Sequence, residues 1–136
     1  MKVVSLFAGI GGFDLAFERA GGHVTAQVEW DKNCKELLAE KFPECGLHGD
    51  IAEVKGASLG EVDVLVGGFP CQDISIAGPR SGLAGERSGL WYQFVRLIEE
   101  TKPKWVIAEN ASVAGLLPSQ GPDPRVSGGH VIAGDH

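Results

Sequence analysis

Residues 2–12 read KVVSLFAGIGG, an apolar run of strand-forming residues that ends in a cluster of glycines. A short apolar run bounded by glycines is typical of a buried strand in a parallel sheet. The next residues, Phe13–Arg19, place Phe13, Ala16 and Phe17 on one helical face, and glycines at positions 21 and 22 end that helix. This succession of strand, glycine turn and helix predicts the first unit of an α/β fold.

Strand-like and helix-like segments alternate along the rest of the chain, which predicts a doubly wound, mostly parallel sheet covered by helices. The predicted strands are Lys2–Phe7, His23–Trp30, Leu47–Ile51, Val62–Val66 and Trp105–Ala108, and the predicted helices are Phe13–Arg19, Asp31–Phe42 and Leu90–Thr101. Residues 71–86 are rich in glycine, serine and proline and are predicted to form a functional loop. We expect a partial domain over residues 1–117, truncated after about the fifth strand, and an extended or poorly packed tail over residues 118–136.

The composition is that of one ordinary globular domain. The chain has 136 residues, of which 43% are hydrophobic and 22% charged, which argues against general disorder. Its three cysteines cannot close a disulfide framework, and no Cys/His cluster has metal-site spacing. We therefore predict a reducing, cytoplasmic compartment, no bound metal and, because no stretch is long and apolar enough, no membrane span.

The charge is unevenly distributed. The formal net charge is −6, with 6 basic against 11 acidic residues in positions 1–70 and 6 against 7 in positions 71–136. A nucleic-acid surface is normally basic, because contacts to phosphates supply much of the affinity. Charge alone therefore does not point to a DNA ligand, although the second half of the chain is close to neutral.

The glycine turn at residues 7–12 has the form of a ligand-binding turn. Its backbone N–H groups and the start of the following helix can approach a ligand closely. Glu29 ends the next strand, where a carboxylate can accept hydrogen bonds from the two hydroxyl groups of a ribose. The third glycine of the dinucleotide pattern is replaced by Asp14, which favours a nucleoside ligand without phosphates. The alternative is a purely structural turn, and Glu29 favours binding.

Two further positions are weaker candidates for the same site. Trp30 follows Glu29 and can stack on an adenine, although packing in the core is the simpler interpretation of this residue alone. Asp50-Ile51 is a candidate for the edge of an adenine, and by itself it is a weak one.

Cys71 and Glu109 follow two successive predicted strands. Cys71 lies in Gly67-Gly68-Phe69-Pro70-Cys71-Gln72, at the carboxyl end of a strand, where open α/β sheets place their sites. A cysteine nucleophile needs access and a lowered pKa, and the start of a loop provides access. A carboxyl group at Glu109, on the adjacent strand, can hydrogen-bond a ring nitrogen and donate a proton to it. Cys34 and Cys45 are predicted to be structural, and a surface ion pair is the alternative for Glu109 alone.

The order of these motifs resembles that of the DNA cytosine-5 methyltransferases over residues 3–117. The resemblance lies in Val4–Gly12, Glu29, Asp50-Ile51, Gly67–Gln72 with its Pro-Cys-Gln, Ser88–Trp91 and Glu109–Ala111, where Ala111 replaces the usual valine. Amino-directed DNA methyltransferases carry an Asp/Asn-Pro-Pro-aromatic motif instead, so Phe69-Pro70-Cys71 argues against them.

The resemblance implies a Rossmann-like fold of the S-adenosylmethionine-dependent methyltransferase type and methyl transfer from S-adenosyl-L-methionine to C5 of cytosine. It implies that Cys71 adds covalently to C6 of a cytosine flipped out of double-stranded DNA, while Glu109 protonates or hydrogen-bonds N3. It further implies cofactor contacts from Phe7, Ala8, Gly9, Gly11, Gly12, Glu29, Trp30, Asp50, Ile51 and Leu90, and DNA contacts from Gln72, Ser75, Arg80 and Arg87.

Members of this family are considerably longer. The arginine motif, the target-recognition domain and the C-terminal segment that follow the Glu-Asn motif in them have no counterpart here. We therefore expect a fragment, half of a split enzyme that a second chain completes, or a decayed gene product, of prokaryotic or phage type and part of a restriction-modification system. Two alternatives stay open: a fragment that binds S-adenosylmethionine without catalysis, and a cytosine-5 methyltransferase of tRNA. Asp14 and Cys71 argue against a third, a nicotinamide-dependent oxidoreductase.

Overall fold

The computed structural model describes residues 1–68, 89–109 and 130–134. Strands and helices alternate through most of the chain, as the sequence predicts. Their order is β1 (Lys2–Leu6), α1 (Gly12–Arg19), β2 (His23–Val28), α2 (Lys32–Lys41), β3 (Gly46–His48), the 3-10 helix η1 (Gly56–Leu59), β4 (Val64–Gly68), α3 (Gly89–Thr101), β5 (Trp105–Glu109) and β6 (His130–Gly134).

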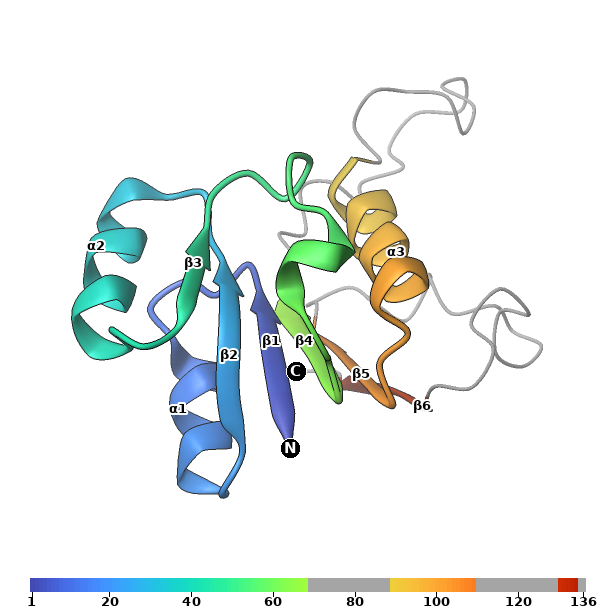
Figure 1. Cartoon of the computed structure of the whole chain (residues 1–136), viewed down its shortest axis with the longest axis horizontal. Helices are drawn as coiled ribbons and strands as arrows, with labels where there is room; N and C mark the ends of the chain where they lie inside the picture. Colours follow the sequence, from blue (N-terminus) through green and yellow to red (C-terminus); the bar gives the residue numbers. More distant parts are fainter. Residues whose placement is uncertain (69–88, 110–129, 135–136) are drawn as a thin grey trace.

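The strands of the described residues lie in one sheet in the order β3-β2-β1-β4-β5-β6, and every neighbouring pair is parallel (Figure 1). The chain runs outward from β1 to β3 on one side and from β4 to β6 on the other, so the order reverses between β1 and β4. Ligands of open α/β sheets bind outside the carboxyl ends of the strands at such a reversal. A ligand site is therefore expected between the ends of β1, at Leu6, and of β4, at Gly68.

Each face of the sheet is covered by a different helix because side chains alternate along the strands. Val4, Leu6 and Leu65 point to the face that packs against α3 and η1, together with Phe94 of α3. A second group of buried side chains points to the opposite face, where Phe17 of α1 packs against it; its members are Val3, Val24, Val64 and Val66. This two-sided burial explains why the strands read as nearly continuous apolar runs, and it confirms the doubly wound arrangement.

The boundaries of α2 follow from local chemistry. Asp31 is its N-cap, and the Asp31 side chain accepts a hydrogen bond of 2.9 Å from the backbone N–H of Cys34. Leu38 is fully buried, whereas Cys34 and Leu37 are only partly buried. The helix ends at Lys41, before Pro43, which cannot continue it.

The sheet is one strand longer than the sequence predicts. β6 pairs with β5 over its whole length, from Trp105 with His130 to Glu109 with Gly134. It lies inside the segment 118–136, for which an extended or poorly packed tail is expected. The signal was a short apolar run, Val131-Ile132-Ala133, between polar and glycine-rich neighbours. Three apolar residues are too few to indicate a strand on their own, because the pairing partner that stabilises them is distant in sequence.

Candidate cofactor and active site

The glycine turn at the end of β1 has an unusual backbone. Phe7, Gly9 and Gly11 have φ angles of 53°, 55° and 84°, so alternate residues are left-handed. Glycine adopts this region without penalty, but Phe7 does so only because its surroundings hold it there. The Phe7 ring stacks on Phe94 of α3, with 6.5 Å between the ring centroids. The turn is thus anchored to the core immediately before it enters α1.

The glycines of the turn have different surroundings. A Cβ atom at Gly11 would lie 2.8 Å from the ring of Phe42 and 3.1 Å from Leu38, so α2 packs directly against this position. A Cβ atom at Gly9 or Gly12 would meet nothing within 4 Å. The backbone at Gly9 and Gly12 therefore borders open space, into which a ligand can approach.

Glu29, one residue beyond β2, connects the two loops that border this space. Its Oε2 accepts a hydrogen bond of 2.7 Å from the N–H of Gly9, and its Oε1 accepts one of 2.7 Å from the N–H of Asp31. Each carboxylate oxygen retains a second acceptor position, so Glu29 can still bind the hydroxyl groups of a ligand.

Trp30 is not a core residue. Its side chain is 77% exposed at the carboxyl edge of the sheet, directly after Glu29. Packing in the core, the simpler interpretation from sequence, is thereby ruled out. A large exposed aromatic surface beside the glycine turn is available to stack on a planar ligand.

Asp50 and Ile51 have different roles in the structure. The Asp50 Oδ1 accepts a hydrogen bond of 2.8 Å from the N–H of Ala52, which fixes the turn after β3. Ile51 is only 4% exposed and belongs to the core on the α3 face. Leu90, at the start of α3, packs partly against the same core. Ile51 therefore presents mainly backbone to the edge of the sheet, while Asp50 presents a carboxylate.

A buried polar network lies behind the glycine turn, and sequence reasoning missed it. Asp14, in the first turn of α1, accepts hydrogen bonds from Ser5 Oγ at 3.1 Å and from Gln27 Nε2 at 2.7 Å. All three side chains are at most 1% exposed. Burial raises the pKa of Asp14 above its ordinary value of 3.8, and the hydrogen bonds from Gln27 and Ser5 oppose that rise. The available signal was a polar residue, Ser5 or Gln27, between apolar neighbours near the end of each of two strands.

This network leads to a pH-dependent prediction. The raised pKa means that the folded chain holds the Asp14 proton more tightly than the unfolded chain does. The protonated Asp14 therefore contributes its full stabilisation below its ordinary pKa, and this contribution is lost as the pH rises through the raised pKa of the folded chain. The asparagine side chain of an Asp14→Asn variant can keep both hydrogen bonds but cannot ionise. We expect the free energy of unfolding of the unaltered chain, relative to this variant, to fall as pH rises above 3.8.

Urea unfolding of both proteins at several pH values measures this difference. Other carboxyl groups, such as Glu100 and Asp63, have lowered pKa values and destabilise both proteins equally as pH falls, so they cancel in the comparison. A difference that stays constant or grows with pH would contradict the prediction.

Glu109, the last residue of β5, lies across the carboxyl end of β4. It is the register partner of Gly68, and its Oε2 is 2.9 Å from the position that a Cβ atom on Gly68 would occupy. The ring of Phe13 lies 3.9 Å from the same position, so Glu109 is on the α1 face, next to the start of that helix. Glycine at position 68 is what lets this carboxyl group cover the strand end.

The proposed nucleophile and DNA contacts lie outside the described residues. They are Cys71, Gln72, Ser75, Arg80 and Arg87. Cys71 follows Gly68 by three residues, so the chain leads to it from the strand end that Glu109 covers. The proximity of Cys71 to Glu109 stays a prediction.

The two described cysteines are poor nucleophiles. Burial, followed by the charges of Asp14 and Glu18, raises the pKa of the Cys45 thiol to about 12. The pKa of Cys34 is also raised, first by burial and then by Asp31. A thiolate is the reactive form, so neither residue competes with Cys71 for this role.

Comparison with known proteins decides the family. The profile described as C-5 cytosine-specific DNA methylase matches residues 1–120. The chain belongs to this family. It is 39% identical over 110 residues to the type II methyltransferase M.HhaI of Haemophilus parahaemolyticus, covering 81% of this chain and 33% of that protein. It is 40% identical over 114 residues to M2.BsuMI of Bacillus subtilis (strain 168), covering 81% of this chain and 29% of that protein.

Solved structures agree with the fold of this cytosine-5 methylase chain. It superposes with a TM-score of 0.70 and 28% identity on a putative DNA modification methyltransferase encoded within a prophage, from E. coli, covering 84% of this chain and 33% of that one. It also superposes on the Dnmt2 methyltransferase of S. pombe, with a TM-score of 0.65 and 18% identity, over 82% of this chain and 36% of that one. The chain thus spans about a third of the length of its relatives. No helix in its described ranges is both long and apolar enough to cross a membrane.

Proposed function

We propose that this chain is the part of a DNA cytosine-5 methyltransferase that binds S-adenosyl-L-methionine and carries the catalytic cysteine. The observation that carries the proposal is the hydrogen bond between Glu29 and the N–H of Gly9. It joins the carboxyl ends of β1 and β2 beside the reversal in strand order, at the edge of the sheet where Glu109 also lies.

The described residues suit a nucleoside-type cofactor that carries no phosphate. The open backbone at Gly9 and Gly12 leaves room for it, Glu29 has acceptors for ribose hydroxyl groups, and Trp30 offers an exposed face for the adenine. Asp50 presents a carboxylate at the adenine edge. The proposed contact set is Phe7, Ala8, Gly9, Gly11, Gly12, Glu29, Trp30, Asp50, Ile51 and Leu90. When bound, the cofactor supplies an electrophilic methyl group.

The proposed chemistry of the protein concerns the cytosine ring. The Cys71 thiolate adds to C6, which forms a C–S bond and moves the ring electrons toward C5. Glu109 holds a proton at N3, so that this nitrogen can accept the negative charge that develops during the addition. After C5 has been methylated, loss of the C5 proton re-forms the double bond and expels Cys71. Each step requires the base to be flipped out of the duplex.

The remaining parts of the proposal concern partners and setting. Gln72, Ser75, Arg80 and Arg87 contact DNA around the flipped base. A second chain, or a further part of the same protein, supplies the target-recognition surface, which fits the net charge of −6 on these residues. The type II names of the relatives favour a prokaryotic or phage-type restriction-modification system in the cytoplasm.

Titration calorimetry with S-adenosyl-L-methionine tests the cofactor site. We expect the unaltered chain to bind, and a Glu29→Gln variant to bind about 10–100-fold more weakly. The glutamine side chain in that variant would offer one acceptor oxygen instead of two, and its amide N–H₂ would oppose the N–H donor of Gly9 or Asp31. A Glu36→Gln variant, altered on the exposed surface of α2, is the matched control and should bind as the unaltered chain does.

Two outcomes would contradict this assignment. No binding by the unaltered chain would remove the cofactor site, and equal binding by the Glu29→Gln variant would remove Glu29 from it. The same preparation, assayed for transfer of a radiolabelled methyl group to DNA and to tRNA, separates a DNA enzyme from an RNA enzyme. Binding without transfer to either nucleic acid favours the alternative that these residues hold the cofactor but have no activity.

A further inference from the structure

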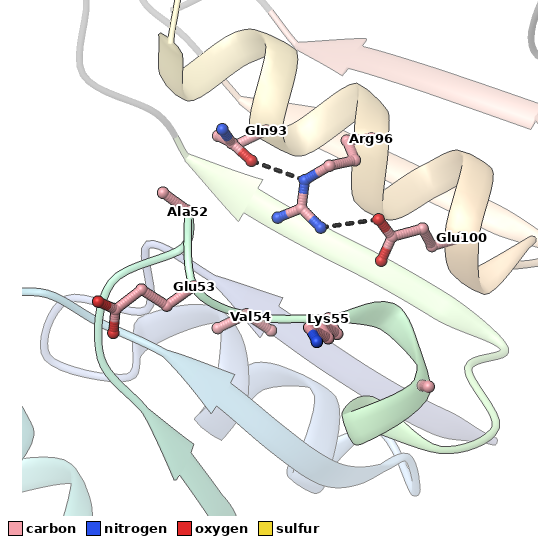
Figure 2. Close-up of a pocket in the computed structure, with 8 residues that line it drawn as sticks. Ala52, Glu53, Val54, Lys55, Gln93, Arg96 and Glu100 are labelled. Carbon is pink, nitrogen blue, oxygen red and sulfur yellow. Dashed lines mark hydrogen bonds and ion pairs between the residues drawn. The ribbon is translucent and has the colours of Figure 1, made fainter.

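The segment between β3 and η1 is tied to α3 by one hydrogen bond near each end. At its start, Arg96 Nη2 donates to the carbonyl oxygen of Ile51 at 2.9 Å. At its far end, the N–H of Gly56 donates to Glu100 Oε2. Arg96 and Glu100 are separated by one turn of α3, and they form an ion pair of 2.8 Å (Figure 2). One helix face thus holds both ends of a segment that is about 45 residues away in sequence.

The Arg96 guanidinium is held in a single orientation. Its Nε donates to Gln93 Oε1 at 2.7 Å and its Nη1 donates to Glu100 Oε1 at 2.8 Å (Figure 2). Its Nη2 donates to the carbonyl oxygen of Ile51. Three acceptors in three directions match the planar fork of arginine and cannot all be reached by one ammonium group. The pKa of Glu100 is lowered, first by the N–H of Gly56 and then by Arg96, so the carboxylate stays charged in this arrangement.

Packing and hydrogen bonds together hold the middle of this segment. Ile51 and Val54 are buried, but Ala52, Glu53 and Lys55 are exposed. Between them and α3 lies an open groove, which Gln93, Arg96 and Glu100 line from the helix (Figure 2). The peptide between residues 51 and 52 follows the buried Ile51 side chain, and its carbonyl oxygen accepts hydrogen bonds from Arg96 Nη2 at 2.9 Å and from the N–H of Val54 at 3.3 Å.

That one peptide unit connects Arg96 to Asp50. Its carbonyl oxygen, on Ile51, accepts from Arg96, and its N–H, on Ala52, donates to Asp50 Oδ1 at 2.8 Å. Rotation of the peptide would break the bond to Asp50 together with those from Arg96 and Val54, since its C=O and N–H point in opposite directions. The direction of the Asp50 carboxylate therefore follows the orientation of this peptide.

We propose that Arg96 is a positioning residue that sets the direction of the Asp50 carboxylate through the peptide between residues 51 and 52, and thereby the selection of an adenine with a 6-amino group. The inference rests on the proposed function, because Asp50 selects adenine only if the cofactor lies at this edge. Arg96 itself does not touch the cofactor. Its effect on binding is therefore limited to the part of the ligand that Asp50 contacts.

The test compares two ligands that differ at one ring position. S-adenosylhomocysteine carries a 6-amino donor, and S-inosylhomocysteine carries a 6-oxo acceptor, which Asp50 would repel. We expect calorimetry to show that the unaltered chain prefers the adenosyl ligand roughly tenfold or more. In an Arg96→Met variant the ratio of the two affinities should fall toward one, mainly through weaker binding of the adenosyl ligand.

Three further variants separate positioning from general stability. An Arg19→Met variant, with the same substitution on the exposed end of α1, should keep the ratio of the unaltered chain. An Asp50→Asn variant should bind the adenosyl and inosyl ligands with nearly equal affinity. Adding Arg96→Met to it should not change the ratio of the two affinities further, because the two residues act through one path. If the Arg96→Met variant does not fold, Arg96→Lys replaces it, since one ammonium group cannot reach all three acceptors.

The outcomes distinguish the inference from the function on which it rests. A folded Arg96 variant that keeps the full ratio overturns the role of Arg96 while leaving the cofactor site intact. Additive losses in the double variant overturn it as well, because they indicate independent effects. Failure of the unaltered chain to bind either ligand overturns the proposed function and the inference with it.

Discussion

Replacing Cys71 with alanine is expected to lower methyl transfer to cytosine by roughly 10⁴-fold or more, which is the scale of losing a covalent nucleophile. Without the thiolate no bond forms at C6, and C5 of the ring stays too electron-poor to attack the methyl group. Binding of S-adenosyl-L-methionine should not change, because Cys71 acts on the base. Transfer of a radiolabelled methyl group to DNA measures the first effect, and calorimetry measures the second.

Covalent trapping gives this prediction a second measurement. When fluorine replaces the C5 hydrogen of the target cytosine, no proton can leave C5 after methylation, so Cys71 is not expelled. The unaltered protein should then stay bonded to the DNA, and this covalent complex should remain intact on a denaturing gel. A Cys34→Ala variant is the matched control, since Cys34 is partly exposed and its pKa is raised. Equal loss in both variants would contradict the catalytic part of the proposal.

Replacing Gly67 with alanine is expected to lower the free energy of unfolding by about 2–3 kcal/mol. A Cβ atom at this position would lie 2.8 Å from the carbonyl oxygen of Leu6 and 2.9 Å from the ring of Phe94. The first contact is with the backbone of β1, which is fixed by the sheet, and the second is with a ring of 0% exposure in the core. Neither neighbour can move without separating strands or disturbing the stack between Phe94 and Phe7.

Urea unfolding of the variant measures this loss, and Gly89→Ala provides the control. Gly89 is at the start of α3, and a Cβ atom there meets nothing within 4 Å. Its replacement should change stability by no more than about 0.5 kcal/mol. If the Gly67→Ala and Gly89→Ala variants unfold at similar urea concentrations, the backbone of β1 and the ring of Phe94 can move aside for the new methyl group, and the prediction is wrong.

Much of the fold could be predicted because its signals are local. The apolar run of β1, the glycines after it and Pro43 beyond α2 each act within a few residues, and the structure confirms the elements they indicate. β6 could not be predicted in the same way. Its apolar residues Val131, Ile132 and Ala133 form a strand by pairing with β5, and a parallel pairing partner is always distant in sequence.

The candidate site shows the same division. Glu29 and Glu109 could be placed at strand ends from the sequence, and the structure locates both at the carboxyl edge of the sheet. The burial of Ile51 and the exposure of Trp30 could not be read from composition, because both depend on which elements cover them. Cys71 lies outside the described residues, so its role still rests on the motif that contains it.

By itself the sequence determined the alternation of strands and helices, the glycine turn and the family, since these depend on residue types at short spacing. Only the tertiary structure decided that Asp14 is buried between Ser5 and Gln27, and that Arg96 reaches the carbonyl oxygen of Ile51. These contacts join residues that lie up to 45 positions apart. They exist because packing the sheet and its helices brings their donors and acceptors together, where burial makes an unpaired polar group costly.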